Sequence, residues 1–203
     1  MKKKITEITE IPEIDPELKK LAEADGVKIV ARSPQRLKQF LEGAITLGEL
    51  EGIDKDVQMK IAKNGFTLLN QGKLAKAKTI FEGLLALDPF DAYFHTALGS
   101  IAFRDKNMET ALKHFDKALS INPFFSTARA HRGEIRLARN NFTGAIEDLI
   151  EAINADPENK QPATQRARAL IGTIKEIMAK IEKNPEAAKI EAERALKNQQ
   201  SKE

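Results

Sequence analysis

The chain has 203 residues, of which 41% are hydrophobic and 31% are charged, and its formal net charge is +3. It contains no cysteine, which excludes disulfide bonds and thiolate metal sites and is typical of a reducing compartment. Basic and acidic residues are interspersed, whereas a nucleic-acid-binding surface needs clustered positive charge. No apolar run approaches the roughly 18 residues of a membrane span. We therefore expect a cytoplasmic protein that binds neither nucleic acid nor a membrane.

The amino-terminal part of the chain is highly charged and contains two prolines. It offers little apolar surface to bury, so residues 1–32 are expected to be a mobile charged segment. Ser33 and Pro34 then mark a helix start, with Ser as the N-cap and Pro at the first helical position. Apolar residues at helical spacing predict one amphipathic leading helix over residues 33–53. Two interpretations stay open: the helix caps the domain that follows, or it is an arm for dimerisation or docking.

The next hundred residues repeat one pattern three times at an interval of 34 residues. Four columns keep this interval without a gap: Gly65, Gly99 and Gly133; Ala77, Ala111 and Ala145; Phe81, Phe115 and Leu149; and Pro89, Pro123 and Pro157. A period of this length indicates a stacked-repeat architecture. The glycines let two helices approach, and the alanines face that contact, where a larger side chain would overpack by about 1–3 kcal/mol. The prolines end each second helix.

These columns resemble those of the tetratricopeptide repeat, a helix-turn-helix unit. The resemblance implies an all-α fold: a right-handed superhelix of three helix-turn-helix repeats with flanking capping helices. We place the repeats within residues 54–157, at about 58–91, 92–125 and 126–159. A C-terminal capping helix over residues 159–182 should cover the last apolar face, because the end of a solenoid has no further repeat to bury it. Residues 183–203 are expected to form a charged, partly helical tail.

The sequence contains no pattern typical of an active site. Its three histidines, His95, His114 and His131, lie far apart in sequence, so each is interpreted as structural. A Gly-rich phosphate loop, a nucleophile motif and a calcium-loop spacing are all missing from the sequence. We therefore expect no catalytic residue, metal, cofactor or small-molecule substrate, and hence not an enzyme.

In a tetratricopeptide stack the first helix of each repeat lines a concave groove, through positions spaced 3, 4 and 3 apart. Those positions hold Met59, Ala62, Phe66 and Leu69; Tyr93, Thr96, Ser100 and Phe103; and Thr127, Ala130, Glu134 and Leu137. Only Glu134 is charged, and an apolar concave patch is typical of a binding site. We predict that the groove binds an extended apolar peptide of a partner protein. The alternative is that these residues only pack on neighbouring helices, in a structural scaffold or oligomerisation protein without a client peptide.

Four arginines lie on one face of the first helix of the third repeat: Arg129, Arg132, Arg136 and Arg139. Like charges at this spacing repel, so nearby acids must compensate them or an acidic partner must bind them. We predict that Arg132 pairs with Asp148 on the following helix. An acidic-partner site at Arg129, Arg136 and Arg139 stays open as the alternative.

Three repeats between a leading and a following helix are similar to the class II chaperones of bacterial type III secretion. The stretch from Phe40 to Leu47 resembles the leading helix of that family, and Asn70–Lys73 with Leu87–Asp91 resembles its first repeat and the following junction. The resemblance implies a secretion chaperone whose groove holds an apolar client segment and whose leading helix forms a homodimer. The third repeat resembles general tetratricopeptide sequence instead.

Another group of related domains grips the acidic carboxy-terminal tail of heat-shock chaperones. These domains use a Lys/Asn pair in the first repeat and basic residues in the third. The corresponding positions here hold Ala62 and Phe66, then Thr127 and His131. We therefore do not expect this carboxylate-binding mode.

Overall fold

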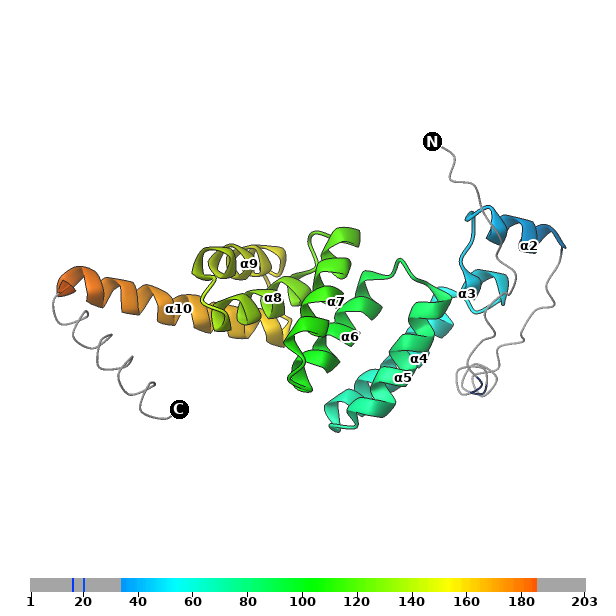
Figure 1. Cartoon of the computed structure of the whole chain (residues 1–203), viewed down its shortest axis with the longest axis horizontal. Coiled ribbons are helices and arrows are strands. Elements are labelled where there is room, and N and C mark those ends of the chain that lie inside the picture. Colours follow the sequence, from blue (N-terminus) through cyan, green and yellow to red (C-terminus); the bar gives the residue numbers. More distant parts are fainter. Residues whose placement is uncertain (1–15, 17–19, 21–33, 186–203) are drawn as a thin grey trace. The chain divides into compact units, whose positions relative to one another are not determined.

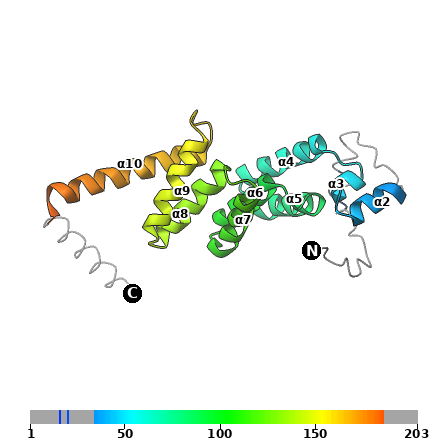
Figure 2. The ribbon, with the colours of Figure 1, turned by 90° about the horizontal axis from the view of Figure 1, so that it is seen from above.

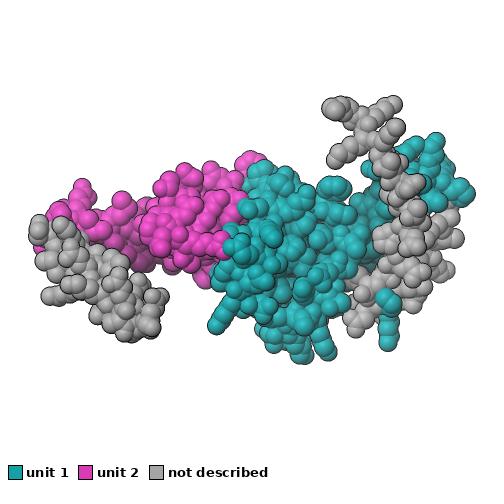
Figure 3. All heavy atoms as spheres, viewed as in Figure 1, with its two compact units in different colours: residues 1–123 teal, residues 124–203 magenta. Residues whose placement is uncertain are grey.

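The computed structural model describes residues 34–185, together with the isolated positions Pro16 and Lys20. The predictions for the charged segment over 1–32, for the Ser33 cap and for most of the 183–203 tail lie outside the described residues. Within residues 34–185 the chain is helical and has no strand, and its helices pack in sequential pairs (Figures 1 and 2). The all-helical repeat fold predicted from the sequence is thus confirmed. The chain divides into unit 1, Met1–Pro123, and unit 2, Phe124–Glu203 (Figure 3).

The part of unit 1 that the structure describes contains two short helices followed by two helix pairs. The short helices are α2 (Pro34–Leu41) and α3 (Leu47–Leu50), and the pairs are α4 (Lys55–Asn70) with α5 (Leu74–Leu87) and α6 (Ala92–Arg104) with α7 (Met108–Ile121). Asp54 caps α4 by accepting a hydrogen bond from the Val57 N–H at 3.0 Å. The second helix of each pair ends two residues before Pro89 or Pro123, as predicted, because proline cannot continue a helix.

Unit 2 contains α8 (Ser126–Ala138), α9 (Phe142–Ala155) and the longer α10 (Pro162–Lys183). Asp156 fixes the start of α10, because its carboxylate accepts hydrogen bonds from the backbone N–H groups of Lys160 and Gln161 and from the Thr164 hydroxyl. The first half of α10 then packs on the α8–α9 pair. The buried residues of this contact are Ala130, Leu149, Ala152, Ala163 and Ala167.

The prediction of one continuous leading helix over residues 33–53 is wrong, because the helix is interrupted between α2 and α3. Gly43 has a φ of 72°, a left-handed conformation that glycine adopts without strain. The N–H groups of Gly43 and Ala44 donate back to the last turn of α2 and close it. Thr46 then starts α3 through a capping box with Glu49. The apolar spacing runs across this break, so periodicity alone could not reveal it.

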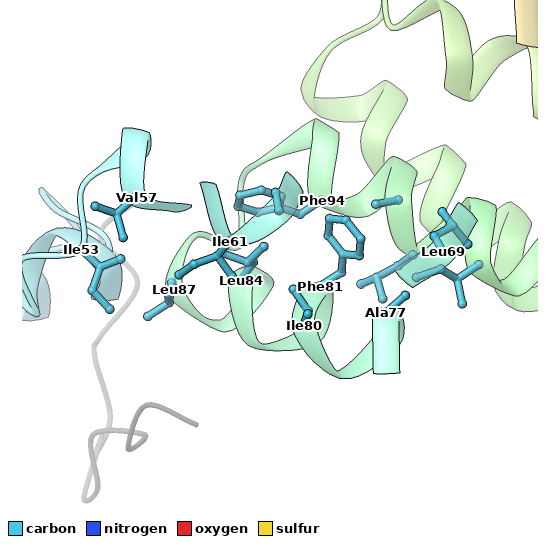
Figure 4. Close-up of a cluster of buried hydrophobic side chains, with 14 of the residues drawn as sticks. Ile53, Val57, Ile61, Leu69, Ala77, Ile80, Phe81, Leu84, Leu87 and Phe94 are labelled. Atoms are coloured by element: carbon cyan, nitrogen blue, oxygen red, sulfur yellow. The ribbon is translucent and has the colours of Figure 1, made fainter. Parts of the chain in front are cut away.

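The two helices of each repeat approach most closely where the glycine of the first meets the large apolar residue of the second, Phe81, Phe115 or Leu149. A Cβ atom built on glycine would lie 2.8 Å from Phe81 Cε2 at Gly65, 2.6 Å from Phe115 Cε1 at Gly99 and 2.9 Å from Leu149 Cγ at Gly133. These distances are shorter than any ordinary carbon contact, so the close approach predicted from the columns is confirmed. Figure 4 shows the resulting core of unit 1, where Ile61, Phe81 and Leu84 lie between the paired helices.

Candidate functional site

The groove residues predicted for the first two repeats lie in unit 1, on α4 and α6. Ala62, Leu69 and Thr96 are buried and contribute to packing between helices. The others keep part of their surface accessible: Met59, Phe66, Tyr93, Ser100 and Phe103. We call these five residues the first-helix face. The structure thus divides the predicted set into packing residues and residues that a ligand can reach.

The centre of the first-helix face is an aromatic pair contributed by adjacent repeats. The ring centroids of Phe66 and Tyr93 are 5.1 Å apart, with the rings tilted by 48°. Behind them, the Phe66 ring meets the fully buried Phe81 edge-on at 5.0 Å, and the Tyr93 ring lies 6.2 Å from Phe94. Such tilted and edge-on contacts are the favoured arrangements of aromatic pairs. The core rings therefore hold both accessible rings in place.

The polar groups beside these rings are already bonded to the backbone. The Thr96 hydroxyl donates to the Ala92 carbonyl at 2.8 Å, and the Ser100 hydroxyl donates to the Thr96 carbonyl at 2.9 Å. Burial, followed by the nearby charge of Asp91, raises the pKa of Tyr93, so its phenol is neutral at physiological pH. The first-helix face thus offers neutral, largely apolar surface, which is suited to contact with apolar side chains.

The third repeat places its predicted groove residues differently. Ala130 is fully buried in the contact between α8 and α10. Glu134 accepts a hydrogen bond from Arg166 Nε at 3.0 Å, and its other oxygen lies 3.6 Å from His131 Nδ1. Burial works to raise the pKa of Glu134, but His131 and Arg166 outweigh it and hold that pKa below its ordinary value. The two remaining members of the set are half-buried: Thr127 and Leu137.

The three arginines of α8 converge on one buried carboxylate. Asp148 is 2% exposed, and Arg132 donates to both of its oxygens, Nε at 2.8 Å and Nη2 at 2.7 Å. Arg136 Nη1 lies 2.9 Å from the same group, and Arg129 lies 3.7 Å from it and 3.1 Å from Glu151. The predicted Arg132–Asp148 pair is confirmed. Because Arg129 and Arg136 are also paired within the unit, the geometry favours a structural role over an acidic-partner site there.

Two histidines that looked isolated in the sequence meet inside the second repeat. The Nδ1 atoms of His95 and His114 are 3.3 Å apart, and His95 Nε2 lies 3.3 Å from the Pro89 carbonyl oxygen. A hydrogen bond between two imidazole nitrogens needs one donor and one acceptor, so at least one ring is neutral. Burial is the main cause that lowers the pKa of both histidines.

The 34-residue interval could have predicted this contact between His95 and His114. His95 and His114 stand in the same two columns as one buried apolar pair and one ion pair: Ile61 with Ile80, and Arg129 with Asp148. Comparing the repeats pair by pair, rather than column by column, would have placed the two rings together.

In the part of the chain that the structure describes, no group of three His, Asp or Glu side chains could hold a metal ion. Among the described helices, none combines the length and the apolar composition needed to cross a bilayer.

Comparison with known proteins agrees with this architecture. Residues 65–125 match the tetratricopeptide repeat family. RNA polymerase II-associated protein 3 of Xenopus laevis is 28% identical over 107 residues, which cover 53% of this chain but only 16% of that protein. The chain therefore spans a small part of the length of this relative.

Several solved structures of similar fold come from type III secretion systems, and others are tetratricopeptide domains such as that of Sgt2 from Aspergillus fumigatus. One is a type III secretion complex from Aeromonas hydrophila, with a TM-score of 0.57 and 21% identity over 70% of this chain and 95% of that one. Another is the Yersinia enterocolitica chaperone SycD in complex with a peptide of the translocator YopD, with a TM-score of 0.51 and 20% identity over 61% and 95% of the two chains. At such identities the likeness concerns the fold alone. The family match over residues 65–125, the repeat columns and the helix pairs show that the chain contains tetratricopeptide repeats.

Proposed function

We propose that the chain is a non-catalytic peptide-binding module whose first-helix face holds an extended apolar segment of a partner protein. The single observation that carries this proposal is the Phe66–Tyr93 pair, in which two adjacent repeats present accessible rings 5.1 Å apart. Because buried rings support both of them, little side-chain freedom is lost on binding, and such preorganisation favours affinity. Aromatic residues in this setting are typical hot spots of protein interfaces.

A more specific proposal is that the partner is a secreted protein held in the cytoplasm before export. The fold likeness to SycD, a translocator chaperone solved with a translocator peptide, supports this proposal. The fold is equally similar to that of a tetratricopeptide domain solved with an acidic HSP90 peptide, so only the residues at the binding positions argue against the acidic-tail mode here. Ala62, which stands where one member of the Lys/Asn pair is expected, is fully buried, and Phe66 is engaged in the aromatic pair.

Binding of two sets of synthetic nine-residue peptides to the full chain tests the proposal. One set alternates Leu, Val or Phe with Ser, and the other alternates Glu with Ser. We expect the apolar set to bind and the acidic set not to bind. Tyr93→Ala and Phe103→Glu should each weaken binding by about thirtyfold, which corresponds to roughly 2 kcal/mol for a truncated hot spot.

Phe90→Glu is the matched control, because Phe90 is 70% exposed and lies in the junction loop before α6, outside the first-helix face. Circular dichroism must show that all three variants remain folded. If Tyr93→Ala and Phe103→Glu bind the apolar peptides as the parent does, these residues are packing surface only. The alternative of a scaffold without a client peptide would then be preferred.

A further inference from the structure

The C-terminal half of α10 exposes large apolar side chains. Ile177 is 50% exposed, Met178 is 61% exposed and Ile181 is 46% exposed. Figures 1 and 2 both show this part of α10 extending beyond α8 and α9 within unit 2. A solvated helix face would carry polar residues at these positions, so the exposed stripe requires an explanation.

The exposed residues continue the stripe by which α10 packs inside its own unit. From the start of the helix, residues alternately 4 and 3 apart are Ala163, Ala167, Leu170, Ile174, Ile177 and Ile181. This alternation is the seam spacing of paired helices. The first two members are small and pack on α8 and α9. The last four, which we call the α10 seam, are large. Leu170 is partly buried against the same core, and the stripe becomes exposed at Ile177 and Ile181.

We propose that the α10 seam pairs, antiparallel, with the α10 seam of a second copy of this chain. The spacing 4, 3, 4 reads the same from either end of the helix. A two-fold axis between Lys175 and Glu176 therefore places Leu170 opposite Ile181 of the second copy and Ile174 opposite its Ile177. Such self-complementarity is what a two-fold dimer requires, because both copies use the same patch.

The residues on either side of the α10 seam are also compatible with this antiparallel pairing. Ile171 and Met178 lie along one side of the seam. Ile171 is partly buried against the core of its own unit, and the Ile171 of the second copy would cover Met178, the most exposed of these side chains. Thr173 and Lys180 lie along the other side and stay polar. A single convex helix offers neither a sheet edge nor a walled groove, the two surfaces that hold extended peptides. A helical occupant of matching length is therefore the better fit.

Light scattering during gel filtration of the full chain tests the proposal. We expect a particle of twice the 22.6 kDa chain mass. Ile177→Glu should convert it to a monomer with an unchanged circular dichroism spectrum, because Ile177 is half-exposed within the single chain. Ala179→Glu is the matched control: it adds the same charge only two residues away, on the side of α10 opposite the seam, and should leave the dimer intact.

Disulfide trapping then tests the antiparallel register, since the chain has no cysteine of its own. A mixture of Leu170→Cys and Ile181→Cys chains should form a mixed disulfide. Leu170→Cys alone should not, because eleven residues of helix put the two thiols roughly 16 Å apart along the axis. A monomeric parent chain would overturn the proposal and leave the seam to another protein or to residues 186–203. A dimer that survives Ile177→Glu, or that is lost in Phe40→Glu instead, would overturn it in favour of another surface such as α2.

Discussion

Arg132 and Asp148 form a two-point ion pair across the α8–α9 contact, with N–O distances of 2.8 and 2.7 Å. Asp148 holds two further arginines, Arg129 and Arg136. The equivalent position of the first repeat is the buried Ile80, and that of the second repeat is His114. The same repeat position thus carries an apolar residue, an imidazole and a carboxylate in the three repeats. Their partners are an apolar core, a second imidazole and arginines, respectively.

The first prediction is that Asp148→Ala destabilises the protein far more than Glu151→Ala. Removing the buried carboxylate leaves three guanidinium groups facing one another, and breaking a buried pair typically costs about 3–5 kcal/mol. The Glu151 side chain is 54% exposed and shares only Arg129, so its loss should cost less than about 1 kcal/mol. Urea denaturation of both variants measures the difference. Equal midpoints would contradict the structural role assigned to Asp148.

The second prediction concerns the glycine column. Gly99→Ala brings a Cβ atom to 2.6 Å from the Phe115 ring, and because that ring is fully buried it has little room to move. We expect a loss of about 1–3 kcal/mol in the free energy of unfolding. Gly172→Ala is the control, since a Cβ atom there meets nothing within 4 Å. In the interior of α10 alanine should instead stabilise the helix, by about 0.5–1 kcal/mol. Destabilisation of equal size in both variants would refute the packing argument.

The sequence was sufficient for the features that depend on local chemistry. Helix ends follow from Pro89 and Pro123, which cannot continue a helix, and the close contacts follow from glycines facing aromatic residues. The sequence could not predict which of the groove residues are solvent-accessible, because accessibility depends on how helices distant in sequence pack. Ala130, for example, is buried in a cluster to which α8, α9 and α10 all contribute. The break at Gly43 was missed for a different reason: its left-handed turn leaves the apolar spacing intact.

The third prediction is that the protein loses stability as the pH falls below about 6.5. Burial lowers the pKa of His95 and His114 in the folded chain from the ordinary value of 6.5. Below that value the unfolded chain binds more protons than the folded chain, so the free energy of unfolding decreases with falling pH. The groups that face the pair have mixed charge, with Asp91 and Glu82 favouring protonation and Lys117 and Lys78 opposing it.

Thermal midpoints between about pH 7.5 and pH 5 measure this effect, a range above the titration of ordinary carboxylates. The double variant His95→Ile with His114→Ile copies the Ile61–Ile80 pair of the first repeat and should flatten the pH dependence. Its stability at pH 7.5 should be at least that of the parent, because the substituted side chains are apolar and of similar size. An unchanged pH profile in the double variant would exclude the histidine pair as its cause.

The last prediction is that apolar peptides bind the first-helix face with little dependence on salt. Tyr93 is neutral, and the Thr96 and Ser100 hydroxyls are bonded to the backbone, so no charge on this face attracts the ligand. Raising NaCl from about 0.05 to 0.5 M should therefore change the dissociation constant by less than about twofold, whereas a contact between exposed charges would be screened over that range. Titration of the same fluorescent peptide at both salt concentrations measures this change. A steep loss of affinity would move the binding site to charged residues, and Arg139→Gln would then show whether the arginine that follows α8 is responsible.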